Sequence, residues 1–181
     1  MIDPALGALL TAGLALLFAT AAFHKFRDVG RFTRVLEAYR VIPEGCARRL
    51  AWSVPCAELA LALALPWPAA RRGAALGAAG LLLAYAAVMT VNLARQRRDL
   101  DCGCAAAGGR RPIAAWMVGR NLLLALASMA VALPWTARAL VGADVLTVAG
   151  GSVACIALYG ALDRLLGDVA PQAALLRKRA S

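Results

Sequence analysis

The chain has 181 residues and a formal net charge of +10; 62% of its residues are hydrophobic and 17% are charged. A soluble globular domain carries roughly 45–50% apolar and about 25% charged residues, and a chain this short has too little interior to hide the surplus. The composition therefore excludes an ordinary soluble enzyme. The basic residues adjoin apolar stretches, which favours the lipid bilayer as partner over nucleic acid, for which no motif is present.

Five apolar stretches approach the roughly 20 residues that a helix needs to cross the hydrocarbon core. They run from about residue 5 to 23, 50 to 67, 73 to 93, 113 to 133 and 145 to 162. The first is too long for the core of a secretory signal, so we interpret it as a retained span. Because backbone groups in lipid need partners within the chain, the stretches predict an all-α, multi-pass transmembrane bundle of four core helices and a flanking fifth. A single domain spans residues 1–181 and ends in a basic tail at 170–181.

The basic segment between the first two stretches, residues 24–49, carries a helical pattern. Phe32, Val35, Leu36 and Tyr39 recur at helical spacing, and charged residues fall between them. This pattern predicts an amphipathic helix that lies in the membrane interface, with a solvated helical loop as the alternative.

Basic residues are distributed very unevenly between the loops that five spans would create. The richer set comprises Lys25, Arg27, Arg31, Arg34, Arg40, Arg48, Arg49, Arg95, Arg97, Arg98, Arg110, Arg111, Arg164, Arg177, Lys178 and Arg179. The poorer set contains Arg71, Arg72 and Arg138. The positive-inside rule then predicts a cell-membrane protein with its N-terminus outside and its basic loops in the cytoplasm.

The loop between the third and fourth stretches carries the clearest chemical signal, Cys102 and Cys104 separated by Gly103. Two cysteines this close can form a small, strained disulfide ring, and strained disulfides are labile and oxidising. Arginines in the same loop favour the thiolate, which attacks disulfides or binds metal, while Asp99 and Asp101 oppose it. The alternatives are two incidental loop cysteines or part of a soft-metal site.

Four further residues are candidate functional groups near this pair. Cys56 is a candidate resolving thiol, although a single cysteine more often packs as a small hydrophobe. Glu58 and Arg120 are ionisable residues within spans, and their similar depth predicts an ion pair that either holds the bundle together or serves a functional cavity. His24 ends the first stretch at the same face, where it can move protons or simply anchor the span.

No cofactor motif is evident in the sequence. A phosphate-binding loop, a dinucleotide-binding glycine pattern, a metalloprotease helix and a nucleophile elbow are all missing. The chain has one histidine, which excludes a histidine-rich haem or zinc centre.

Several motifs resemble a known family of membrane proteins. The segments Phe23–Asp28 and Pro55–Ala60 look like the DoxX-like superfamily. Asp101–Cys104, followed by Trp116 and Arg120–Leu123, is similar to the MauE branch, the methylamine utilisation protein family. The resemblance covers about residues 5–133. Its one departure is that the family usually has Phe-Gly after the second cysteine, where this chain has two alanines.

The resemblance implies an accessory membrane protein associated with methylamine metabolism. It would support disulfide formation and maturation of an exported client, such as the methylamine dehydrogenase small subunit, with a thioredoxin-like protein as companion. Whether the chain is itself an enzyme stays open. As an enzyme it would be a membrane thiol–disulfide oxidoreductase, for which a quinone is the candidate electron acceptor.

This role and the distribution of charge predict opposite locations for the cysteine loop. An oxidant for exported proteins should present its thiols outside, whereas the positive-inside rule places Cys102 and Cys104 inside. A relay across the membrane would need a second thiol, for which Cys56 or Cys155 is available. Two other classes of function remain open, a carrier for small solutes or soft metals and a subunit of a redox complex without chemistry of its own.

Overall fold

The computed structural model describes residues 1–43, 45–97, 100–101, 112–136, 138–139, 141–155, 157–158 and 160–161. Its labelled helices are α1 (Pro4–Arg27), α2 (Val29–Tyr39), α3 (Ala47–Ala64), α4 (Pro68–Ala94) and α5 (Ala115–Val131), and a further helix covers Gly142–Cys155. These described residues form helices and no strand longer than an isolated bridge. The predicted all-α class is confirmed.

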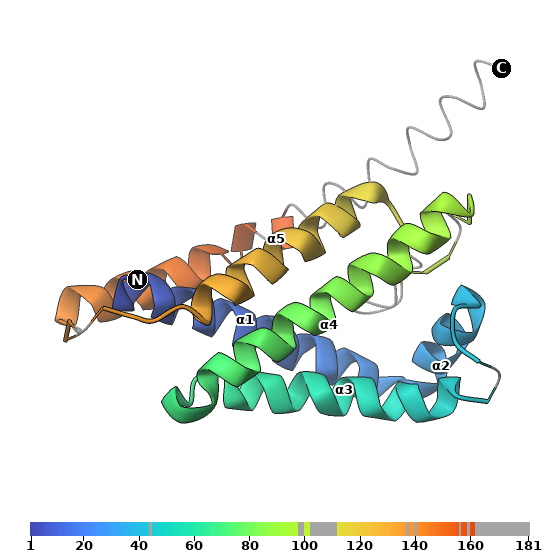
Figure 1. Cartoon of the computed structure of the whole chain (residues 1–181), viewed down its shortest axis with the longest axis horizontal. Coiled ribbons are helices and arrows are strands. Elements are labelled where there is room, and N and C mark those ends of the chain that lie inside the picture. The colour runs from blue at the N-terminus through green and yellow to red at the C-terminus, as the bar shows by residue number, and fades with distance from the viewer. Residues whose placement is uncertain are drawn as a thin grey trace, which may run out of the picture.

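Four of the helices, α1, α3, α4 and α5, run alternately up and down as a bundle, and α2 lies across one end of it (Figure 1). Helix α1 packs most extensively on α3, and α4 on α5. We call the end covered by α2 the α2 end. It contains the last turns of α1 and α4 and the first turns of α3 and α5. Residues far apart in sequence therefore meet there.

Polar caps and prolines set the helix boundaries. The Asp3 carboxylate accepts a hydrogen bond from the Ala5 backbone N–H at 2.9 Å, and Pro4 follows at the first helical position. Asp28 ends α1 and caps α2 by accepting from the Arg31 N–H at 2.8 Å. Pro68 starts α4 directly after Trp67, five residues before the predicted stretch at 73–93, so Arg72 lies in the first turns of α4.

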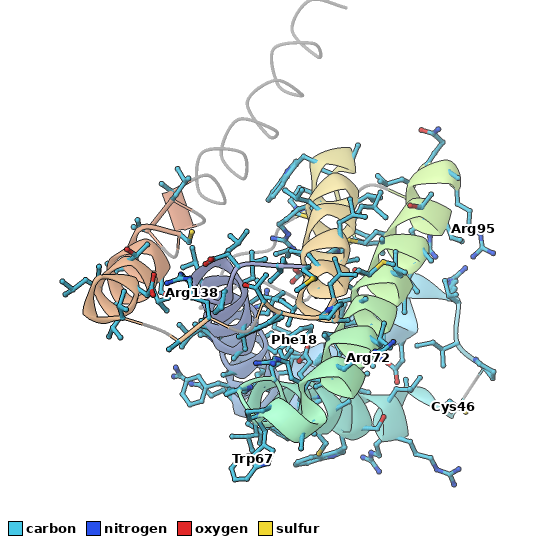
Figure 2. All side chains as sticks on the ribbon, turned by 60° about the vertical axis from the view of Figure 1, so that its left-hand side comes forward. Phe18, Cys46, Trp67, Arg72, Arg95 and Arg138 are labelled. Atoms are coloured by element: carbon cyan, nitrogen blue, oxygen red, sulfur yellow. The ribbon has the colours of Figure 1, made fainter. Side chains whose placement is uncertain are left out.

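Small side chains dominate the centre of the bundle. Phe18 of α1 is 1% exposed and points into the interior (Figure 2), where it packs near an alanine stripe of α4. The buried members of that stripe are Ala74, Ala75, Ala78 and Ala79. In lipid, small residues let helix backbones approach closely, and van der Waals contact then replaces the hydrophobic effect as the main attraction.

Within the described part of the chain two helices are long and apolar enough to cross a membrane, α1 with 24 residues and α4 with 27. At 1.5 Å per residue they measure about 36 and about 40 Å, which exceeds the roughly 30 Å hydrocarbon core. Helices α5 and Gly142–Cys155 are apolar but shorter. Helix α3 has 18 residues and contains Arg48, Arg49 and Glu58. The chain is thus built as a helical membrane bundle; the end of the predicted fifth stretch and the tail at 170–181 lie outside the described residues.

The amphipathic pattern of α2 is confirmed, but its apolar face is covered by protein. Phe32 and Leu36 pack with Ala47 and Ala51 of α3, while Val35 and Tyr39 belong to a cluster with α4 and α5 residues. The four predicted positions are the buried residues of the helix. Helix α2 therefore covers the end of the bundle as a lid. The side chains that hold it there are those whose spacing led to the prediction of an interfacial helix.

The opposite end is tied by contacts between the N-terminus and the segment after α5. Ile2 pairs with Trp135 in a parallel bridge, through hydrogen bonds of 3.0 Å to Pro134 and 2.9 Å from Thr136. Arg138 lies between α1 and the helix Gly142–Cys155 (Figure 2), where it contacts Asp3 at 3.2 Å and Asp144 at 2.8 Å. These contacts hold the beginning and the end of the bundle together.

Replacement of Gly7 tests the packing at this end. A Cβ atom at Gly7 would lie 2.6 Å from the Trp135 ring, whereas one at Gly13 meets nothing within 4 Å. We expect Gly7→Ala to lower the free energy of unfolding by about 1–3 kcal/mol, the usual range for overpacking. Gly13→Ala is the matched control in the same helix and should leave stability unchanged or raised by up to about 1 kcal/mol. Equal thermal stability of the two variants would contradict the packing.

The pH dependence of stability tests the Arg138 contacts. Hydrogen bonds from Arg138 lower the pKa values of Asp3 and Asp144 below their ordinary value of 3.8. A carboxylate with a lowered pKa contributes stability above its unfolded pKa and loses it as the pH falls through the lowered value. We therefore expect the thermal midpoint to fall on acidification below about pH 4, and to fall less in Arg138→Gln. Parallel pH profiles for the two proteins would rule out this contribution.

Candidate functional site

A buried ion pair joins α1 and α3 near the α2 end. The Lys25 ammonium contacts Oε1 of Glu58, and the Tyr85 hydroxyl of α4 donates a hydrogen bond to the same oxygen at 2.7 Å. The side chains of Lys25 and Glu58 are 4% and 1% exposed. Three helices thus contribute to one polar cluster in an apolar bundle, which we call the Lys25–Glu58–Tyr85 cluster.

Aromatic rings complete the surroundings of the ammonium. Lys25 Nζ lies 5.4 Å from the centroid of the Phe32 ring and 5.3 Å from that of Tyr85. Cation–π attraction of this kind strengthens when the charge is shielded from water. Since Phe32 belongs to α2, the position of that lid is coupled to the buried charge.

The predicted ion pair between Glu58 and Arg120 was wrong. Glu58 pairs with Lys25, and the Arg120 guanidinium lies 5.3 Å from the centroid of the Trp116 ring on its own helix. Depth along a helix axis was estimated from residue counts, but the direction of a side chain around that axis was not. The proposed functional roles of Glu58 and Arg120 are a separate matter and remain predictions.

Lys25 and Tyr85 were missed as candidate site residues. Lys25 is the last of the buried residues of α1, which recur every three or four positions: Gly7, Thr11, Leu14, Phe18, Ala22 and Lys25. Because the helix is apolar on all sides, its sequence does not show which face is buried. His24, the neighbour of Lys25, lies off this stripe, is half-buried and stacks edge-on against Phe23 at 5.9 Å between ring centroids. The half-buried Tyr85 gave no signal either.

A second polar cluster holds the base of the cysteine loop against α2. Arg31 contacts the Asp101 carboxylate at 2.6 Å, and the Tyr39 hydroxyl donates to the Asp101 carbonyl at 3.1 Å. On the other side of the loop, the Ile113 N–H donates to the Leu100 carbonyl at 3.0 Å, and Asp101 pairs with Pro112 in an antiparallel bridge. The segments that enter and leave the loop are thus held side by side.

Arg97 fixes the end of α4 to the end of α2. Its guanidinium donates to the carbonyls of Ala38 at 2.8 Å and Tyr39 at 3.2 Å, and it contacts the Asn92 amide oxygen at 3.4 Å. Asn92 is fully buried. The last carbonyls of a helix lack partners within it, and the Arg97 guanidinium supplies a donor to two of those of α2.

The predicted cysteine sites are distributed as follows. Cys102 and Cys104 lie outside the described residues, although both residues that flank their loop are fixed. Cys56 is exposed on α3, two residues before the buried Glu58. Cys155 is also exposed, and Cys46 is half-buried just before α3. Among the described residues no group of three or more His, Cys, Asp or Glu side chains could hold a metal ion.

The family model for methylamine utilisation protein MauE matches residues 3–136. This chain belongs to the MauE family. The predicted family is therefore confirmed, and the matched range includes α1 to α5 and both polar clusters of the α2 end.

Three methylamine utilisation proteins MauE illustrate the similarity. The chain is 40% identical to that of Paracoccus denitrificans over 66% of its own length and 64% of the relative, so it spans slightly less than two thirds of that protein. It is 33% identical to that of Methylorubrum extorquens over 72% of this chain and 70% of the relative. For Paracoccus versutus the identity is 38% over 88% and 87%. No solved structure matches this MauE-family chain.

A double-mutant cycle tests the buried ion pair. Removing one partner of a buried pair leaves an uncompensated charge, so we expect Lys25→Met and Glu58→Met each to lower the free energy of unfolding by about 3–5 kcal/mol. The double variant should be clearly more stable than the sum of the two losses predicts. Arg120→Met is the control, because its effect should add to that of Glu58→Met within about 0.5 kcal/mol. Coupling of Glu58 to Arg120 instead of Lys25 would contradict the pairing.

Proposed function

We propose that this chain is a multi-pass protein of the cell membrane that supports maturation of an exported client by thiol–disulfide exchange at Cys102 and Cys104. The MauE family links it to methylamine utilisation. A disulfide-containing client, such as a methylamine dehydrogenase small subunit, and a thioredoxin-like companion belong to the proposal. In this role Cys102 and Cys104 form the redox pair.

The observation that carries this proposal is the fixed base of the cysteine loop. Asp101 directly precedes Cys102 and is held by Arg31 and Tyr39 of α2. Cys102 directly follows this fixed residue, and Cys104 is two positions further along the chain. Two thiols so close in sequence can close an intramolecular disulfide after a mixed disulfide has formed. An incidental pair of loop cysteines would need no such base.

Positive charge at the α2 end supports the same chemistry. Arg31 contacts the Asp101 carboxylate, and Arg97 donates to the carbonyl of Tyr39. Arg95 donates to the Arg40 carbonyl at 3.4 Å. Cationic side chains favour the thiolate, which is the form that attacks a disulfide. Arg31 already neutralises Asp101, the acidic neighbour that would otherwise raise the thiol pKa.

The membrane arrangement remains part of the proposal. The bundle alternates direction, so loops at the α2 end share one face if α1, α3, α4 and α5 all cross. The positive-inside rule would make that face cytoplasmic, with the N-terminus outside, and electrons from an exported client would then need a relay in which Cys56 is the resolving thiol. With the opposite orientation the pair would meet its client directly.

Labelling of the thiols in intact cells tests function and orientation together. A membrane-impermeant maleimide would be applied with and without prior reduction to a chain that retains Cys102 and Cys104 and has serine at its other three cysteines. We expect two labels per chain only after reduction, in intact cells if the α2 end faces outside and only in opened cells if that end is cytoplasmic. The Cys102→Ser/Cys104→Ser variant is the background control for labelling. We also expect the client protein to lose its disulfides in cells that carry this variant.

Two results would overturn the proposal. One is full client maturation with serine at both positions. The other is protection of the thiols that depends on added metal and not on oxidation, which would favour a carrier. Labelling only after the cells are opened would leave the chemistry intact and place the α2 end in the cytoplasm.

Substitution of Arg31 tests the base of the loop. Arg31→Gln removes the cation from Asp101, so we expect the apparent pKa of the reduced thiols to rise and their alkylation at neutral pH to slow several-fold. Arg34→Gln, an exposed substitution on the same helix, is the matched control. Equal alkylation rates and equal pH profiles in both variants would contradict a role for Arg31.

A further inference from the structure

Helix α1 presents an exposed stripe that becomes basic at the α2 end. In the second half of this helix the exposed residues recur every three or four positions: Leu16, Thr20, Phe23 and Arg27. Residues at this spacing lie on one face of a helix. The outer face of α1 is therefore mainly apolar up to its last turn, where it ends in a guanidinium.

Helix α3 carries a similar stripe in the opposite direction. The exposed Arg48 and Arg49 lie in its first turn. Exposed residues then follow Arg48 at the same helical spacing: Trp52, Cys56, Leu59 and Leu63. Because α3 packs on α1 and starts at the α2 end, the basic ends of both stripes lie at that end of the bundle (Figure 1).

Aromatic rings connect the two basic ends. The centroids of the Phe26 and Trp52 rings are 6.2 Å apart, and the Arg27 guanidinium lies 5.6 Å from the centroid of the Phe23 ring. Phe23 and Trp52 are nevertheless 58% and 54% exposed. Tryptophan is enriched where lipid headgroups meet the hydrocarbon core, so this position suits the membrane interface.

The arginines of this surface have no acidic partner of their own. No ion pair between described residues includes Arg27, Arg48 or Arg49. Asp28, the neighbour of Arg27, accepts a hydrogen bond from the Arg31 N–H as the cap of α2. Three cations thus stand beside one acid, and the excess of positive charge suits an anionic ligand.

We propose that Arg27, Arg48 and Arg49 bind the phosphate groups of anionic phospholipids at the α2 end. Helix α1 is longer than the hydrocarbon core, so its last turn reaches the level of the phosphates when the helix crosses a bilayer. Guanidinium groups suit phosphate oxygens because they offer several N–H donors in one plane. We call the three arginines together with Phe23 and Trp52 the α1–α3 rim.

The continuation of both stripes favours a lipid over an acidic protein as the ligand. Below the rim, Leu59 and Leu63 of α3 and Leu16 of α1 remain exposed. These side chains can contact the acyl chains of a lipid whose headgroup lies at the arginines, whereas a soluble partner would reach only the outermost turn. The inference depends on the bundle lying in a membrane and is independent of thiol exchange.

Native mass spectrometry of the full chain in a non-ionic detergent tests the rim. Phosphatidylglycerol and phosphatidylcholine with identical acyl chains would be added in equal amounts, and we expect phosphatidylglycerol to be retained several-fold better. Arg27→Gln, Arg48→Gln and Arg49→Gln should each weaken its binding about fivefold, the usual contribution of one basic side chain at an anionic membrane surface. Arg72→Gln is the matched control, since this exposed arginine lies in the first turns of α4 at the opposite end.

Three results would overturn the inference. The first is equal retention of the two lipids, and the second is an equal loss of binding in Arg72→Gln, because net charge alone would then explain the selectivity. The third is displacement of phosphatidylglycerol by polyglutamate, which would favour an acidic protein partner. Unchanged lipid selectivity in the Cys102→Ser/Cys104→Ser variant supports the rim whether or not thiol exchange is confirmed.

Discussion

The contact between Lys25 and Glu58 is the constraint around which the α2 end is organised. Each charge alone would be very costly in a bundle built for lipid, and the pair becomes tolerable because Tyr85 and the ring of Phe32 complete its surroundings. Four helices must therefore meet in one arrangement. Hydrophobic replacement of a buried ion pair is often neutral or stabilising, so this pair is weak evidence of a gain in stability.

Helix α2 connects this buried charge with the cysteine loop. Phe32 faces Lys25, while its neighbour Arg31 reaches Asp101 and Tyr39 holds the carbonyl of the same residue. A helix of only 11 residues thus touches both polar clusters. A movement of Asp101 at the base of the loop could therefore be transmitted to the ion pair through α2.

Much of the fold could be predicted from hydrophobicity, because segments that enter lipid must be apolar and helical. The amphipathic spacing of α2 likewise identified the side chains that are buried, although not the surface that buries them, since a membrane and a helix bundle both select the same apolar face. Less of the site was predictable. Glu58 was recognised from its cost in lipid, but its partner depends on rotation about the helix axes, which residue counting does not give. Arg120 was equally deep and faced elsewhere; Lys25 was assigned to the basic rim because it ends a span.

The bridge between Ile2 and Trp135 has a consequence for the architecture of the family. The family match covers residues 3–136, so its two limits coincide within a residue with the two partners of that bridge. Two backbone hydrogen bonds therefore connect Ile2, ahead of α1, with the segment that follows α5. The helix Gly142–Cys155 follows this connection and is joined to the start of α1 by the contacts of Arg138 with Asp3 and Asp144. Because this helix joins the bundle at the end opposite α2, we expect changes in it to leave the Lys25–Glu58–Tyr85 cluster undisturbed.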